Sequence, residues 1–335
     1  MGKYEENLVA WGRAADDEIY TLEQALLNKN AEIESLHYLI GEKDAIIAAK
    51  SDTIARKNAR INNLKAKLDE CLGKEPAPSE PVEPATVFGS STGAHTYDEF
   101  TAMAGAPLKV RRSYEVDVPT DFTKRSTGYD IGRCATVVSM KPDLVALNTR
   151  QLDNKILYYL STIPTDHRVH LIIWHEPEDN IENGSFSAAE YKQGQVVMRN
   201  LVNTANMNRA VPIRFGGNWM SWSVNPKSGR NAEDYYPGDN VWDFLSWDGY
   251  EQKGTTRSPV EIFGPCVNFN NSHGLRFAVA ETGVSTSKPS DYRVEWIIQN
   301  KVYASTNNAE FWCYWDGSFA DFELITVDEF KAVVY

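Results

Sequence analysis

The N-terminal part of the chain carries a seven-residue repeat of large aliphatic side chains. Isoleucine or leucine recurs at Ile19, Leu26, Ile33, Ile40, Ile47, Ile54, Ile61 and Leu68. This spacing places one apolar stripe along a helix and is typical of the a positions of a coiled coil. The first proline is Pro76, so one helix over about residues 17–72, roughly 80 Å long, is predicted. A stripe of that length requires partner helices, so residues 1–73 are predicted to form a homo-oligomerising coiled coil.

The d positions of this repeat leave the number of strands open. Leucine occupies some of them, but four carry lysines, which weakens the seam: Lys29, Lys43, Lys50 and Lys57. Isoleucine at a suits two or three strands; a trimer is favoured from the architecture of the whole chain, with a dimer as the alternative. Cys71 falls at d, where a parallel bundle permits an interchain disulfide. The competing interpretation is a single amphipathic helix packed on its own domain.

A proline-rich acidic stretch separates this helix from the rest of the chain. Residues 74–85 contain four prolines, which cannot continue a helix and favour extended geometry, so a semi-rigid linker is predicted. The remaining residues, 86–335, number about 250, which is the usual size of a (β/α)8 barrel.

The pattern of residues 86–335 agrees with a barrel. Eight short apolar runs are candidate strands: residues 86–90, 108–114, 135–140, 169–174, 211–215, 244–247, 277–280 and 310–314. Longer segments between them have helical spacing or polar character, and plausible helices among them are 148–163, 187–207, 258–271 and 290–304. Alternating strands and helices favour an α/β fold with parallel strands and right-handed crossovers. We therefore predict a TIM barrel preceded by a coiled-coil helix.

Charge and motif content exclude several classes of function. The chain has 34 basic and 46 acidic residues, a net charge of −12, which disfavours nucleic acid as a partner. No stretch reaches the roughly 18 apolar residues of a membrane span, and the first residues lack a secretory signal pattern, so neither membrane insertion nor signal-directed export is expected. No glycine-rich phosphate cradle, paired cysteines or His-Glu-x-x-His pattern occurs, so we predict no cofactor and no catalytic metal.

Two glutamates follow apolar runs at the places where a barrel carries its active site. Glu176 ends the fourth run, before Pro177, and Glu281 ends the seventh. Because the carboxyl ends of barrel strands share one rim, the two carboxylates are expected to meet there. Such a pair hydrolyses glycosides when one protonates the leaving oxygen and the other attacks the anomeric carbon; in retaining enzymes they lie about 5–5.5 Å apart. The alternative is that each caps a helix or forms a surface ion pair.

The chain resembles clan A retaining glycosidases, especially family 26 of β-mannanases, over about residues 86–320. The resemblance rests on the pair His175-Glu176 at the fourth run and on Glu281 at the seventh. Most of the clan has Asn before its acid/base glutamate, whereas family 26 has His, as this chain does at 175. The resemblance implies that Glu176 is the acid/base and Glu281 the nucleophile. The chain differs from family 26 in lacking the aromatic run that often follows the His-Glu pair.

Aromatic and amide side chains near the other strand ends are candidates for sugar binding. Tyr250 is expected to donate its hydroxyl to Glu281, and Trp315 to present a flat apolar face to a pyranose. Trp219, with Trp222 and Asn218, follows the fifth run and is expected to add a platform and hydrogen bonds. For each aromatic, packing in the core is the alternative.

Three further positions bear on the same site. Arg111 or Arg112 is expected to stabilise the nucleophile, and since side chains alternate along a strand only one of them points inward; Arg112 is our choice for substrate binding, together with His175. A histidine beside a glutamate is more often a structural group than a metal ligand, so a structural role is the alternative for His175. Glu178 and Asp179 are expected in a solvated loop rather than lining the cleft.

A serine hydrolase is the competing enzyme class. Residues 89–93 spell Gly-Ser-Ser-Thr-Gly, in which Ser91 would be the nucleophile and His273 the nearest candidate base. A nucleophile elbow belongs after a central strand, whereas this motif follows the first, so the context disfavours it.

An oligomerising stalk, a proline-rich joint and a carbohydrate-active barrel together resemble a bacteriophage tail or fibre protein. The resemblance implies a trimeric stalk, assembly in the cytoplasm and a place in the virion tail, released by lysis. We therefore expect a retaining endo-glycosidase that acts on a cell-envelope or capsular polysaccharide. The alternatives are a receptor-binding protein that keeps the barrel without turnover, and a structural barrel on a functional coiled coil.

Overall fold

The computed structural model describes residues 86–91, 93–124, 130–317 and 321–335, with the isolated residues 2, 26 and 29. The chain divides into two units, Met1–Val82 and Glu83–Tyr335. The predicted linker, residues 74–85, and the predicted coiled coil apart from residues 2, 26 and 29 lie outside the described residues. The strands that the structure describes all belong to the second unit.

Eight parallel strands form a closed barrel in which each strand pairs with the next and the eighth pairs with the first. They are β1 (Val87–Ser91), β2 (Val110–Glu115), β3 (Ala135–Met140), β4 (Val169–Ile173), β5 (Arg214–Met220), β6 (Phe244–Glu251), β7 (Arg276–Val284) and β8 (Phe311–Tyr314). The predicted (β/α)8 barrel is therefore confirmed. Each predicted strand overlaps an observed one.

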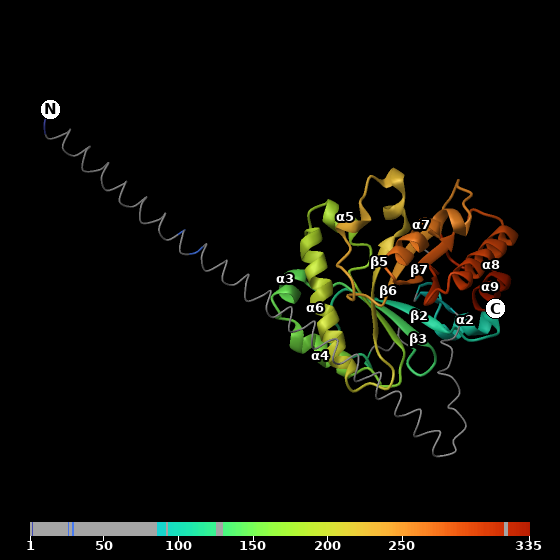
Figure 1. Cartoon of the computed structure of the whole chain (residues 1–335). Helices are drawn as coiled ribbons and strands as arrows, with labels where there is room; N and C mark the ends of the chain where they lie inside the picture. Colours follow the sequence, from blue (N-terminus) through green and yellow to red (C-terminus); the bar gives the residue numbers. More distant parts are fainter. Residues whose placement is uncertain are drawn as a thin grey trace, which may run out of the picture. The chain divides into compact units, whose positions relative to one another are not determined.

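Helices surround the strands, as Figure 1 shows. They are α2 (Tyr97–Ala104), α3 (Leu144–Asn148), α4 (Asp153–Ser161), α5 (Glu178–Glu182), α6 (Ala188–Asn206), α7 (Pro259–Ser272), α8 (Ser290–Thr306) and α9 (Val327–Val334), with the short 3-10 helices η1 (Ser221–Val224), η2 (Pro226–Ser228) and η3 (Ala232–Asp234). Capping boxes fix several starts: Ser187 with Glu190 opens α6, and Ser258 with Glu261 opens α7. Among the described residues, no helix is both long and apolar enough to span a bilayer.

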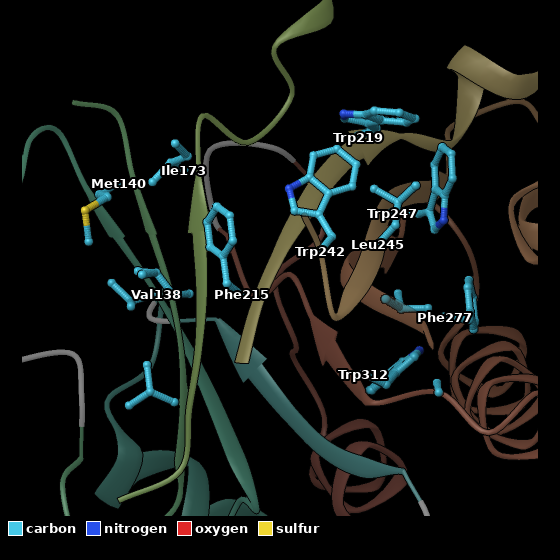
Figure 2. Packing of buried hydrophobic residues seen from close by; sticks show 14 of the residues in the cluster. Val138, Met140, Ile173, Phe215, Trp219, Trp242, Leu245, Trp247, Phe277 and Trp312 are labelled. Carbon is cyan, nitrogen blue, oxygen red and sulfur yellow. The ribbon is translucent and has the colours of Figure 1, made fainter. Parts of the chain in front are cut away.

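Side-chain alternation along the strands divides the core into two layers. The inner layer fills the barrel and consists of Val110, Val137, Ile172, Phe244, Ala278, Ala280, Phe311 and Cys313. The outer layer lies between strands and helices and contains the buried tryptophans; Figure 2 shows Trp219, Trp242 and Trp247 gathered beside Leu245. Inward-facing side chains near the carboxyl ends of the strands are polar instead, so this end of the barrel can hold a functional site.

An ionic cluster occupies the opposite, N-terminal end of the barrel. Glu310 precedes β8 and lies 3.2 Å from His170 Nε2, 3.3 Å from Arg214 Nε and 3.5 Å from Arg276 Nε. Burial opposes ionisation of Glu310, but its hydrogen bond to His170 and the neighbouring positive charges hold its pKa at about 2. The cluster therefore stabilises the folded barrel in its ionised form.

Replacing Glu310 tests this cluster. A carboxyl whose folded pKa is depressed contributes stability above its unfolded pKa near 4.5, and loses it as pH falls toward 2. Glu310→Gln should therefore lower the free energy of unfolding by about 3 kcal/mol at pH 7, and the deficit should shrink as the pH is lowered. Urea denaturation between pH 7 and 3 measures it, with the exposed Glu295→Gln as control. A deficit that does not depend on pH would contradict the ionic role.

Candidate active site

The segment after β4 turns sharply and carries Glu176 to the rim. Trp174 and Glu176 have positive φ values of 53° and 48°, a left-handed geometry that non-glycine residues adopt only when surrounding bonds enforce it. The Trp174 backbone N–H donates to the Met140 carbonyl over 2.9 Å, and that of Glu176 to the Asn218 carbonyl over 3.0 Å. Backbone strain is thus held at the position where the sequence predicts an acid/base group.

A β-bulge aims Glu281 into the barrel. Trp247 of β6 pairs with Val279 of β7, yet the next residue, Asp248, pairs with Glu281, so β7 contains one extra residue at this point. Paired residues of neighbouring strands point to the same side of a sheet. Since Asp248 is buried in the barrel mouth, Glu281 points there as well.

Arg112 joins these carboxylates. Its Nη2 lies 3.0 Å from Glu281 Oε1, and its Nη1 lies 3.5 Å from Asp248 Oδ1 and 3.1 Å from Asn218 Oδ1. The guanidinium is fully buried. Arg111, in contrast, donates from Nη2 to the His95 carbonyl over 2.6 Å. Of the two arginines, Arg112 is therefore the one that points into the site.

Two tyrosine hydroxyls complete the surroundings of Glu281. Tyr114 donates to Oε1 over 3.0 Å, and Tyr250 donates to Oε2, as the sequence predicted. Burial, together with the negative charge of Glu281, raises the pKa of Tyr250 well above its usual range. Burial likewise raises that of Tyr114. Both phenols are therefore protonated donors, and with Arg112 they supply three interactions that stabilise a Glu281 carboxylate.

Glu176 has different surroundings. Among the described residues no cation lies within ion-pair distance of it, and its side chain is largely buried. Burial, and next the negative charge of Glu281, raise the pKa of Glu176 to about 7. At neutral pH a substantial fraction therefore carries a proton, which is what a general acid requires.

Asn218 lies in the same network. Its Nδ2 donates to Asp248 Oδ2 over 2.6 Å, and its Oδ1 accepts from Arg112. It is fully buried, so it holds the acidic network together; the structure gives it no exposed surface for a sugar. Burial, and next Glu281, raise the pKa of Asp248 well above its ordinary value.

Three groups at this rim are not among the residues predicted from the sequence: Tyr114, Lys141 and Asp248. Alternation along a strand would have identified two, since Tyr114 is two positions after Arg112, and Asp248 two before Tyr250. Lys141 follows β3 directly, with its Nζ 5.6 Å from the Trp174 ring centroid. Burial lowers its pKa, and Glu176 is the first of the charges that oppose this.

His175 and Trp315 lie beside Tyr114, as expected for residues of one pocket mouth. The Tyr114 ring centroid is 5.6 Å from His175 and 5.3 Å from Trp315, both edge-on. Burial, and next the charges of Arg112 and Lys141, depress the pKa of His175 well below its usual range, so the imidazole is neutral. Its Nδ1 is buried without a hydrogen-bond partner among the described residues.

Trp219 is placed differently from the prediction. Asn218 and Trp219 are neighbours on β5, so when Asn218 faces the barrel interior, Trp219 faces the helices. Its ring is completely buried, 5.4 Å from Trp242 and 5.6 Å from Trp247 (Figure 2). Its Nε1 donates to the Tyr191 hydroxyl over 3.2 Å. The ring is part of the outer core and offers no face to a sugar.

Glu178 does not lie in the solvated loop that the sequence predicts. It is fully buried, and its Oε1 accepts from the Met220 backbone N–H over 2.9 Å and from Ser223 Oγ over 2.7 Å. Asp179 is exposed and pairs with Arg230 over 2.6 Å. Burial raises the pKa of Glu178 to about 7.

The serine-hydrolase arrangement is not assembled. Ser91 is buried at the end of β1, and its Oγ accepts from the Asp316 backbone N–H over 3.1 Å. His273 ends α7, where its ring bonds to Phe269 O and Glu233. Ser91 therefore lies on a strand with its hydroxyl already hydrogen-bonded, and not on the sharp strand-to-helix turn of a nucleophile elbow.

Beside Glu176 a pocket of about 450 Å³ opens between the ends of β5 and β6. Asp248 and Tyr250 also line it, and both contact the network around Glu281. The described residues contain no group of three or more histidine, cysteine or acidic side chains arranged to hold a metal ion.

Solved structures with a similar fold include endo-β-1,4-mannanases. A double mutant of the Cellulomonas fimi enzyme is 14% identical, with a TM-score of 0.52 over 75% of this chain and 70% of that one. A modular family 26 mannanase from the same organism is 14% identical, with a TM-score of 0.51 over 74% of this chain and 70% of that one. The family 26 catalytic domain of the Bacillus sp. JAMB-750 mannanase is 11% identical, with a TM-score of 0.50 over 74% of this chain and 85% of that one. At these identities the likeness establishes the barrel fold. Comparison with protein-family models and with curated proteins finds no match.

Electrostatic coupling between the two glutamates is testable by titration. Because the charge of Glu281 helps raise the pKa of Glu176 to about 7, Glu281→Gln should lower the pKa of Glu176. Carboxyl ¹³C NMR of selectively labelled protein measures this, with Glu310→Gln at the far end of the barrel as control. An unchanged Glu176 pKa in Glu281→Gln would show that the two carboxyls do not share a site.

The same shift affects stability. A raised folded pKa means that the folded state binds the proton more tightly than the unfolded chain, so stability falls as pH rises from about 4.5 to 7. Glu176→Gln should remove this part of the pH dependence.

Proposed function

We propose that this protein is a retaining endo-glycosidase in which Glu176 is the acid/base and Glu281 the nucleophile. The observation that supports the proposal most directly is that the two carboxyls have different surroundings. Arg112 and two tyrosine hydroxyls surround Glu281, whereas burial raises the pKa of Glu176 to about 7. Two carboxyls placed in such different environments are the signature of acid/base and nucleophile roles.

In the first step the Glu281 carboxylate bonds to the anomeric carbon while Glu176 gives its proton to the glycosidic oxygen, which leaves as an alcohol. In the second step Glu176, now ionised, takes a proton from water as the water oxygen replaces Glu281 on that carbon. The sugar departs with its original configuration, and both carboxyls return to their starting states.

The neighbouring side chains fit these steps. During attack, Tyr114 and Tyr250 can keep their hydrogen bonds to Glu281 while the new bond to the anomeric carbon neutralises its charge and proton transfer leaves Glu176 as the carboxylate. The Nδ1 of the neutral His175, unpartnered within the described chain, suits a sugar hydroxyl, and Trp315 offers a half-buried ring at the same mouth. His175, Trp315 and the Arg112 network are accordingly proposed to bind or orient the substrate.

The substrate class is proposed from the neighbours and the chain architecture. The solved structures with this fold include enzymes that act on β-1,4-mannan, so a β-linked hexose polymer is the first class to test. The heptad repeat and proline-rich stretch support an oligomer, with three copies favoured, that carries the barrel to a cell-envelope or capsular polysaccharide as part of a phage tail. Several weak sites on one stalk gain affinity through effective concentration.

A polysaccharide panel tests the proposal. Wild-type protein is incubated with mannans, xylans, glucans and bacterial envelope glycans, and reducing ends are counted. Cleavage of one class is expected, with losses of at least about 10³-fold in Glu176→Gln and Glu281→Gln. The conservative Glu295→Gln on α8 should keep full activity. Binding without cleavage, equal in wild type and both site variants, would instead identify a receptor-binding barrel.

A further inference from the structure

Trp222 is an exposed tryptophan on the rim of the pocket beside Glu176. It lies in η1, directly after β5, and 44% of its surface is exposed, in contrast to the buried Trp219. Within the described part of the chain its ring has no aromatic or polar partner. A large apolar ring left open beside a polar pocket is suited to the C–H face of a sugar.

The pocket lies on the Glu176 side of the site. Glu176 is among its lining residues, whereas Glu281 and Trp315 are not, and Trp315 packs against Tyr114. The acid of a retaining glycosidase contacts the leaving-group oxygen, and the nucleophile contacts the sugar ring that is retained. A sugar held in this pocket would therefore belong to the leaving group.

We propose that Trp222 forms a subsite for the sugar unit on the leaving-group side of the cleaved bond. The proposal rests on the proposed glycosidase function and adds the direction in which the chain lies. Gln252 and Arg257 also line this pocket and give it polar groups. The Arg257 Nη2 donates to the Tyr250 carbonyl over 2.5 Å, which fixes the side chain there, and its Nε has no partner among the residues described. These groups suit the hydroxyls of a pyranose stacked on Trp222.

Glu178 is the positioning residue for this subsite. Its Oε1 holds both ends of the segment that carries Trp222, through the Met220 N–H at 2.9 Å and Ser223 Oγ at 2.7 Å. Gly249 of β6 permits the close approach of the same segment, since a Cβ there would lie 2.8 Å from Ser221 Oγ. Glu178 comes two residues after Glu176, so one short stretch of chain supplies the proton donor and anchors the platform beside it.

Two substrates separate the subsite from the chemistry. β-1,4-Mannohexaose places sugars on both sides of the cleaved bond, whereas 2,4-dinitrophenyl β-mannobioside has an activated leaving group without a sugar. Trp222→Ala should raise KM for the hexaose about tenfold and leave kcat/KM for the aryl substrate within about twofold. Trp222→Phe should restore most of the loss, and Tyr158→Ala, which removes an exposed aromatic on α4, should change neither value.

Glu178 variants supply the second arm. Glu178→Gln keeps an oxygen acceptor for Met220 and Ser223 and should behave like wild type, while Glu178→Leu should reproduce the KM effect of Trp222→Ala. An equal loss on both substrates in Trp222→Ala, or no loss on the hexaose, overturns the subsite. So does a wild-type protein that cleaves the aryl substrate but not the hexaose. The glycosidase proposal fails by a different result, which is that no polysaccharide of the panel is cleaved.

Discussion

A guanidinium buried in the barrel mouth is the constraint on which the site depends. Arg112 has no exposed surface, and a charge in that position is tolerated only when carboxylates and hydrogen-bond acceptors surround it. Glu281, Asp248 and Asn218 meet that need from three different strands. The same interactions that make burial of the arginine tolerable therefore fix the relative positions of β2, β5, β6 and β7 at the rim.

The arginine also divides the acidic groups into two kinds. Glu281 lies against it and accepts two phenolic hydrogen bonds, so its charged form is supported. Glu176 lies farther from any cation in the described chain and next to the charge of Glu281, so its protonated form is favoured. Burial on one side and Arg112 on the other thus give two identical side chains different environments, which is the difference that the proposed acid and nucleophile roles require.

How far the sequence predicts this site depends on knowing which side chains of each strand face the barrel interior and which face the helices. Short apolar runs identified all eight strands, and their ends identified Glu176 and Glu281. Alternation limited Arg111 and Arg112 to one inward residue, but the same rule, applied to Asn218 and Trp219, would have assigned the tryptophan to the outer core. Simple alternation fails at Glu281, which follows the inward Ala280 and enters the barrel because of a bulge that no sequence pattern marks. Burial of Glu178 likewise depends on tertiary contacts with η1, remote in sequence.

Covalent trapping addresses the division of roles most directly. A 2-deoxy-2-fluoro glycosyl donor with a good leaving group, matched to the sugar that the protein cleaves, slows the second step more than the first and lets the intermediate accumulate. If Glu281 is the nucleophile, the mass should increase by one glycosyl unit per chain, with the label mapped by peptide analysis to Glu281 and absent from Glu281→Gln. A label on Glu176, or turnover with inverted product and no label, would contradict it.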